Sequence, residues 1–271
     1  MTFDGQDLLH ASDSQMRALR GRRIAMVMQD PKYSLNPVMT VGQQLTEGLR
    51  MRDRLGRAEA EARATADEAA AAGVKTAAFK ADLSCEAETA ALIGRVREKM
   101  GPLAALINNA SCFDKDDWQS ATRSSWDKHM ETNLRAPFVL TQDFARQVPE
   151  GGQGAVVNLI DQRMLKPTPQ FMSYSLSKAG LRWLTVTLAQ ALAPRVRVNA
   201  VGPGPTMIGV RQSEADFARQ RRATVLGRGA EPQDVCDAVR YLLEAPSVTG
   251  QMIATDGGQH LIWRTSDAMG E

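Results

Sequence analysis

GAVVNLID, residues 154–161, is a short apolar run that closes in polar residues, and the helical run KAGLRWLTVTLAQALA, residues 178–193, follows it. The first run is typical of a buried strand bounded by turn residues, and the longer one is typical of a helix. Strand-like runs recur at 75–82, 103–111, 195–204 and 250–258, and helical runs at 87–100, 126–148 and 231–245. This alternation predicts an α/β fold with a doubly wound parallel sheet.

Composition narrows the function classes. The 271 residues, 43% hydrophobic and 24% charged, are enough for one large α/β domain or two small ones. The net charge is +2 and no basic cluster carries aromatic residues, so we expect no nucleic-acid partner. The N-terminal MTFDGQDLLH has neither a basic segment leading into an apolar one nor a stretch that could cross a bilayer. We therefore predict a cytoplasmic protein without a membrane partner.

Cysteine and histidine usage gives no sign of a metal site. Cys85, Cys112 and Cys236 have no CxxC spacing, and the three histidines are equally scattered. An odd number of separated cysteines fits a reducing compartment better than a disulfide framework or a zinc site. We expect no metal.

The residues that close the strand-like runs are the first candidates for a site, because ligands of such sheets bind beyond the carboxyl ends of the strands. They are Asp82, 108–113, Asp161 and 202–206, which carry an unusual share of polar and small groups.

SYSLSK, residues 173–178, places Tyr174 and Lys178 one helical turn apart on one face of a helix. A neighbouring ammonium favours the phenolate and is expected to lower the pKa of Tyr174, so that the phenol can hand a proton to a developing alkoxide. The pair alone has an ordinary alternative, a half-buried tyrosine beside a surface lysine.

Further motifs stand around this pair in a fixed order. They are LINNAS (106–111), METNLRAPF (130–138), NLID (158–161) and VRVNAVGPGPT (196–206). In this order and spacing, residues of about 75 to 263 resemble the short-chain dehydrogenase/reductase family. The resemblance implies a Rossmann-like sheet, a nicotinamide dinucleotide, and hydride transfer coupled to proton transfer through Tyr174.

The same resemblance implies roles for individual residues. Lys178 would hold the nicotinamide ribose, and Asn133 would carry a proton relay through a water. Cofactor contacts are expected from Asp82 beside the adenine, from Asn109 and Ala110, from Ser111 at the cofactor or the substrate, and from Pro203, Gly204 and Thr206 along the nicotinamide and pyrophosphate.

Asp161 departs from the pattern, because most of the family has a serine thirteen residues before the tyrosine. The aspartate is similar to that of the pteridine reductase and dihydromonapterin reductase-like branch, where it acts with the tyrosine in protonating a ring nitrogen. By that resemblance Phe113, just after NNAS, would stack on a flat pterin. The ordinary alternatives are a carboxylate that caps the turn after the strand and a phenylalanine that fills the core.

The glycine-rich turn of a dinucleotide-binding sheet is missing from the sequence. No TGxxxGxG or GxGxxG occurs before residue 75. Residues 1 to about 60, with IAMVMQDP and SLNPVMTV, instead resemble the Q-loop region of the ATPase subunits of oligopeptide and dipeptide ABC importers. Because GxxxxGK[ST] and LSGGQ are absent, we interpret Gln29 as a polar residue that ends a strand and expect no ATP hydrolysis.

The chain is thus expected to be a chimera, in which residues 1–60 replace the usual first βαβ unit of a domain at 61–271. We hypothesise that residues 24–29 supply a surrogate strand, because an empty slot would leave ladder groups unpaired. The loop after it has two prolines and no glycine, so it gives no cradle for a pyrophosphate.

Two functions follow. The first is a reductase, using NADP(H) rather than NAD(H), of a small-molecule substrate that could be a pterin, another cyclic imine or a ketone; its catalytic residues would be Tyr174, Lys178, Asp161 and Asn133. The second is a catalytically impaired or silent protein of the same fold. By resemblance we expect a homo-oligomer, a dimer or tetramer, although the apolar runs 181–192 and 250–263 would equally suit a monomer core.

Overall fold

A computed structural model of the chain describes residues 2–3, 6–7, 66–67, 70, 75–208 and 212–263. The chain divides into two compact units, Met1–Lys80 and Ala81–Glu271. In the first unit, β1 (Thr2–Phe3) pairs antiparallel with β2 (Gln6–Asp7). The proposed surrogate strand at 24–29 lies outside the described residues.

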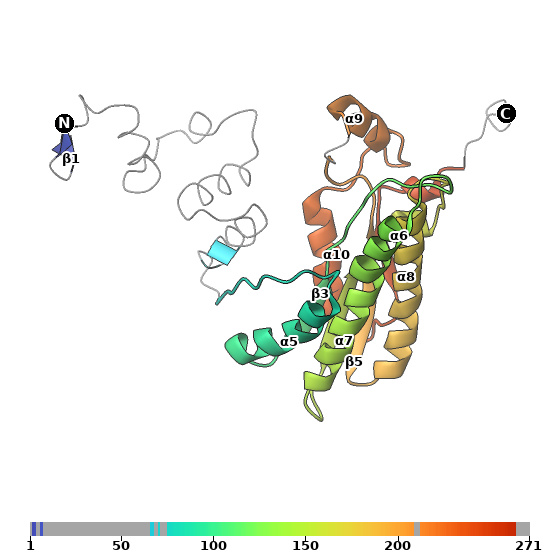
Figure 1. The fold of residues 1–271 in the computed structure, drawn as a ribbon. Coiled ribbons are helices and arrows are strands. Elements are labelled where there is room, and N and C mark those ends of the chain that lie inside the picture. The colour runs from blue at the N-terminus through green and yellow to red at the C-terminus, as the bar shows by residue number, and fades with distance from the viewer. Residues whose placement is uncertain are drawn as a thin grey trace, which may run out of the picture. The chain divides into compact units, whose positions relative to one another are not determined.

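The second unit, with helices in front of its sheet in Figure 1, contains four parallel strands. Their order is β3-β4-β5-β6, which confirms the predicted Rossmann-like α/β fold. The strands are β3 (Ala105–Asn108), β4 (Gly154–Leu159), β5 (Val196–Pro203) and β6 (Met252–Thr255). The helical elements are α5 (Glu86–Met100), α6 (Arg123–Met130), η1 (Glu131–Arg135), α7 (Ala136–Gln147), η2 (Gln162–Met164), α8 (Met172–Leu192), α9 (Glu214–Arg222), α10 (Pro232–Glu244) and η3 (Gln259–Leu261).

Alternating side chains of β4 and β5 build a core on each face of the sheet. Val156 and Val198 pack with α7 and α8, in a cluster that includes Phe144. Val157 faces the other way and packs with Leu242 of α10. This is the pattern of strands buried on both sides, and it explains why the two runs are almost continuously apolar.

β3 lies at one end of this sheet. Its Ile107 side chain is 46% exposed, and among the described residues β3 pairs only with β4. The apolar run at 75–82 was predicted to be a strand, and this prediction is wrong: residues 75–82 have no regular structure. A strand requires a neighbour for its backbone groups, and no described residue supplies one beside this segment.

The predicted helix at 126–148 is interrupted by one π-helical turn, η1, between α6 and α7. Such turns are frequent at functional sites, because the extra residue redirects the side chains of the helix. Within the described part of the chain, no helix combines the length and the apolar character needed to cross a membrane.

Candidate active site

A cavity of about 630 Å³ opens where the strands β4 and β5 end. It is of the size that small-molecule sites occupy. Its walls come from the turns after both strands, from the start of α8 and from α9. The residues that line it are Phe113, Asp114, Asp161, Gln162, Arg163, Phe171, Tyr174, Pro203, Gly204, Pro205, Met207, Gln212, Phe217, Gln220 and Gln259.

Asp161 and Tyr174 meet at this cavity. The Tyr174 hydroxyl donates a hydrogen bond of 2.9 Å to Asp161 Oδ2. Asp161 Oδ1 accepts the backbone N–H of Arg163 at 2.8 Å, so the aspartate also caps η2. The interpretation of Asp161 as the cap of the turn after the strand is therefore confirmed, whereas its part in protonating a substrate stays a prediction.

The pKa of Tyr174 is raised, whereas the sequence predicted that it would be lowered. Burial is the first cause of the raised pKa, since Tyr174 is only 5% exposed. The negative charge of the Asp161 carboxylate raises the pKa further. An anion beside a buried phenol disfavours the phenolate, and the Arg163 cation opposes this only in part. The correction is physical: the sequence did not reveal how deeply the ring is buried.

Lys178 is buried one turn further along α8. Its Nζ donates to the carbonyl oxygen of Leu159 at 2.8 Å and stands 6.0 Å from the centre of the Tyr174 ring. Burial lowers the pKa of Lys178 to about 8, and the Asp161 carboxylate opposes this shift. The ammonium therefore sits at the end of β4, held by the strand itself.

Asn133, on the π-helical turn, is fully buried. Its Nδ2 donates to the Cys112 carbonyl at 3.0 Å and to Ser177 Oγ at 3.1 Å, and its Oδ1 accepts the Cys112 N–H at 2.9 Å and the Ser111 hydroxyl at 3.1 Å. The side chain thus joins the loop after β3 to α8. Its part in a proton relay stays a prediction.

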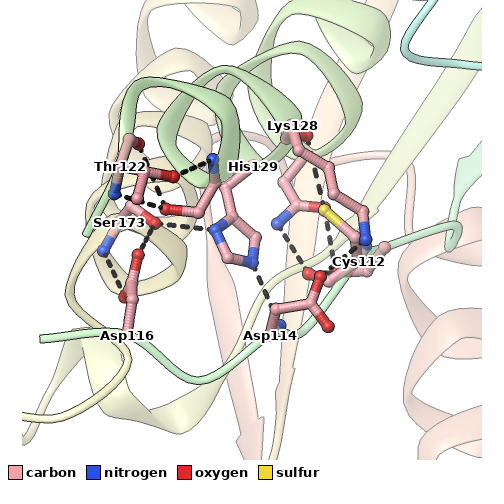
Figure 2. Close-up of polar contacts among 10 residues, drawn as sticks. Cys112, Asp114, Asp116, Thr122, Lys128, His129 and Ser173 are labelled. Atoms are coloured by element: carbon pink, nitrogen blue, oxygen red, sulfur yellow. Dashed lines mark hydrogen bonds and ion pairs between the residues drawn. The ribbon is translucent and has the colours of Figure 1, made fainter. Parts of the chain in front are cut away.

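A second polar network fixes the loop that carries Phe113. Figure 2 shows the His129 ring between Ser173 and Asp114. His129 Nε2 accepts the Asp114 N–H at 3.1 Å, so the ring proton is on Nδ1, 2.7 Å from Ser173 Oγ; Ser173 in turn donates to the Asp116 carboxylate. Burial lowers the pKa of His129, which keeps the ring neutral.

Phe113 is 40% exposed and does not fill the core. Its ring stacks on that of Phe171, with centroids 4.4 Å apart and planes inclined by 12°, and meets the Tyr174 ring edge-on at 4.6 Å. Phe171 has φ 58°, in the left-handed region that side chains rarely adopt. Strain of this kind persists where the surroundings impose it, and here it places an aromatic ring at the cavity.

The structure brings together only part of the predicted site. Asp161, Tyr174, Phe113, Pro203 and Gly204 line the cavity, and Lys178 and Asn133 are buried nearby. The remaining predicted cofactor residues, Asp82, Asn109, Ala110, Ser111 and Thr206, do not line it.

Some features of the site were not recognised in the sequence, chiefly Arg163, Phe171 and the four glutamines of the cavity wall. Arg163 directly follows NLIDQ, and Phe171 lies just before SYSLSK, but residue type and spacing give no signal for either. Among the described residues, no group of three or more His, Cys, Asp and Glu side chains is arranged to hold a metal ion.

The chain has a parallel sheet flanked by helices and a buried Tyr-x-x-x-Lys pair beside the carboxyl ends of the strands. These features place it in the class of Rossmann-like proteins. A family model described as enoyl-(acyl carrier protein) reductase matches residues 55–260. The chain belongs to the short-chain dehydrogenase/reductase family. The resemblance that we expected between residues 1 to about 60 and an ABC ATPase subunit falls almost wholly before this match and stays a prediction.

Individual relatives agree with this assignment. The 3-oxoacyl-(acyl-carrier-protein) reductase FabG of Staphylococcus aureus is 30% identical over 206 residues, which are 74% of this chain and 84% of the relative. Among solved structures, FolM alternative dihydrofolate reductase 1 from Brucella canis, complexed with NADP, is 44% identical with a TM-score of 0.73, covering 76% of this chain and 82% of that one. A blue fluorescent protein from a metagenomic library, in complex with NADPH, is 26% identical with a TM-score of 0.69 and covers 76% and 84%.

Proposed function

We propose that this protein is an NADPH-dependent reductase of a pterin or a similar flat ring with a C=N or C=O bond. The observation that carries the proposal is the hydrogen bond of 2.9 Å between Tyr174 and Asp161, at the wall of a cavity where Phe113 presents its ring. The similarity to an alternative dihydrofolate reductase that binds NADP supports both the cofactor and the substrate class.

The nicotinamide end of a dinucleotide fits the residues present. Lys178 Nζ has three N–H donors, and its bond to Leu159 uses one of them, so two remain for ribose hydroxyls. Pro203 and Gly204 form the neighbouring wall. The described residues offer no comparable cradle for the pyrophosphate.

A reduced nicotinamide, when bound, supplies the hydride for such a reduction. The protein's own part is to hold the substrate ring and to deliver a proton. Phe113 offers a face on which a flat ring can stack. Tyr174 has a raised pKa and so keeps its proton at neutral pH, as a proton donor for the reductive direction requires.

Asp161 completes the proton-transfer pair. Its Oδ2 accepts the Tyr174 hydroxyl and so fixes where the phenolic proton points before the substrate arrives. The buried Lys178 ammonium stabilises the phenolate that remains after the proton has left. Asn133 holds the loop after β3 against α8, and through it the position of Phe113.

The alternative is a catalytically impaired or silent protein of the same fold. The observation that favours it is the missing glycine-rich turn, together with the uncovered edge of β3 in the described part of the chain. In that case the proton-transfer residues are present without a complete cofactor site. The proposed division into an ABC-ATPase-like segment at 1–60 and a reductase-like domain at 61–271 accompanies either function.

A titration of the full-length protein with NADPH, followed by nicotinamide fluorescence, decides between the two. A dissociation constant in the micromolar range, with turnover of dihydrobiopterin that is lost in Tyr174→Phe, is the result expected for the reductase. A folded protein that binds no NADPH at millimolar concentration would overturn the proposal and establish the silent alternative. NADH in the same titration tests the preference for the phosphorylated cofactor.

A further inference from the structure

Arg163 occupies a position between the proton-transfer pair and the aromatic wall of the cavity. Its guanidinium carbon lies 5.3 Å from the centre of the Phe113 ring and 5.2 Å from that of Phe171. Its Nη1 donates to Asp161 Oδ2 at 3.1 Å, and the side chain is 20% exposed. The cation is therefore held in place by three side chains and still reaches the cavity.

The guanidinium of Arg163 has N–H donors without a hydrogen-bond partner among the described residues. Of its five N–H donors, one has a partner among the described residues, the carboxylate of Asp161. The other charged side chains of the described cavity wall are Asp114 and Asp161, and Asp114 pairs with Lys128 at 2.6 Å. Arg163 is thus the one cation among the described lining residues, and a guanidinium donates but never accepts.

The donors of Arg163 and Tyr174 are close neighbours. Both bind the same oxygen, Asp161 Oδ2, at 3.1 Å and 2.9 Å, so Nη1 and the phenolic oxygen are at most about 6 Å apart. A flat ring that receives its proton from Tyr174 therefore has a neighbouring ring position within reach of the guanidinium. An oxygen acceptor at that position can be bound, and an N–H donor there cannot.

We propose that Arg163 is a specificity-determining residue that donates a hydrogen bond to a carbonyl oxygen on the substrate ring, next to the atom that Tyr174 protonates. This inference rests on the proposed function and narrows its substrate class to oxo-substituted N-heterocycles. A ring with an amino group in place of the carbonyl turns N–H donors towards the guanidinium and loses that bond. The selectivity follows because the wrong ring leaves N–H donors of the partly buried guanidinium unpaired in the complex.

The test compares two rings that differ at this one substituent, 2-amino-4-oxo-6-methylpteridine and 2,4-diamino-6-methylpteridine. Their binding to the full-length protein saturated with NADP⁺, which cannot reduce them, is measured by calorimetry for the wild type and for Arg163→Gln. A glutamine amide can donate or accept, so the variant loses the discrimination. We expect its affinity for the oxo ring to fall about tenfold or more and that for the diamino ring to stay equal or rise.

Two further variants complete the design. Arg163→Lys keeps a cationic donor and is expected to retain more of the oxo preference than the glutamine variant. Arg123→Gln is the matched control, because the Arg123 side chain is 89% exposed and pairs with Asp127 on the surface; it is expected to bind both rings as the wild type does. Equal losses for both rings in Arg163→Gln would overturn the inference, because a residue that only supports the cavity affects them alike.

Failure of the proposed function has a different signature. In that case the wild type itself binds neither ring in the presence of NADP⁺, which overturns the function and this inference together. If the wild type binds and reduces a pterin but Arg163→Gln keeps the full oxo preference, only the inference is overturned. A kinetic comparison adds a second measurement: loss of the carbonyl contact raises KM for the oxo ring, whereas disturbance of Asp161 lowers kcat.

Discussion

Replacement of Lys178 by methionine is expected to stabilise the protein at neutral pH while it removes a group that we propose to be catalytic. Burial lowers the pKa of Lys178 from its ordinary value of 10.5 to about 8, which corresponds to a cost of about 3 kcal/mol for holding the charged form in the folded state. Methionine has a similar length and no charge. Its own cost is the lost bond to the Leu159 carbonyl, about 1–2 kcal/mol.

The sign of the pH dependence follows from linkage. Below about pH 8 both the folded and the unfolded lysine are protonated, and the full cost is present. Between about pH 8 and 10.5 the folded protein releases the proton and the unfolded chain keeps it, so the wild type gains stability as the pH rises. The methionine variant lacks this gain. We expect it to be about 1–2 kcal/mol more stable than the wild type at pH 7 and less stable near pH 10.

Urea unfolding of both proteins at a series of pH values between 7 and 10 measures this difference. Other titrating groups are common to both chains, so their contributions cancel in the comparison. A difference in unfolding free energy that stays constant across the series, or a variant that is clearly less stable at pH 7, would refute the reasoning about the buried ammonium.

Three further predictions concern the cavity. In Asp161→Asn the anion beside Tyr174 is removed, so the pKa of the phenol falls and the alkaline limb of the reductive pH profile moves to lower pH; an unchanged limb in steady-state rates would contradict this. Phe113→Ala removes the stacking face, and we expect KM for a pterin to rise about threefold to tenfold with a smaller change in kcat, whereas an unchanged KM would exclude stacking. Ser173→Ala leaves His129 Nδ1 and a carboxylate oxygen unpaired, and thermal unfolding should show a loss of about 1–3 kcal/mol; no loss would show that the network contributes little.

The sheet and the placement of Tyr174 and Lys178 one turn apart on a helix could be predicted from the sequence, because both are local patterns. The apolar runs at β4 and β5 indicate strands that are buried on both faces. The spacing of Tyr174 and Lys178 corresponds to one turn of a helix. The run at 75–82 has a strand-like composition, yet it is not a strand, since pairing depends on a neighbour that composition does not reveal.

The remainder of the site depends on contacts between distant segments. The direction of the Tyr174 pKa shift was predicted wrongly, because the burial that decides it is a property of the folded cavity. His129 was one of three scattered histidines, and its partners stand 15 and 44 residues away. Arg163 gains its position from Phe113 and Phe171, which the fold alone brings together.

The most direct test of the reductase function is the consumption of NADPH by the full-length protein, with and without a dihydropterin, in the wild type and in Tyr174→Phe. The account predicts consumption that requires the dihydropterin and that falls by about a hundredfold or more in the variant, because the phenol is the proton donor. Equal rates in the two proteins, or no consumption by a wild type that binds NADPH, would contradict it.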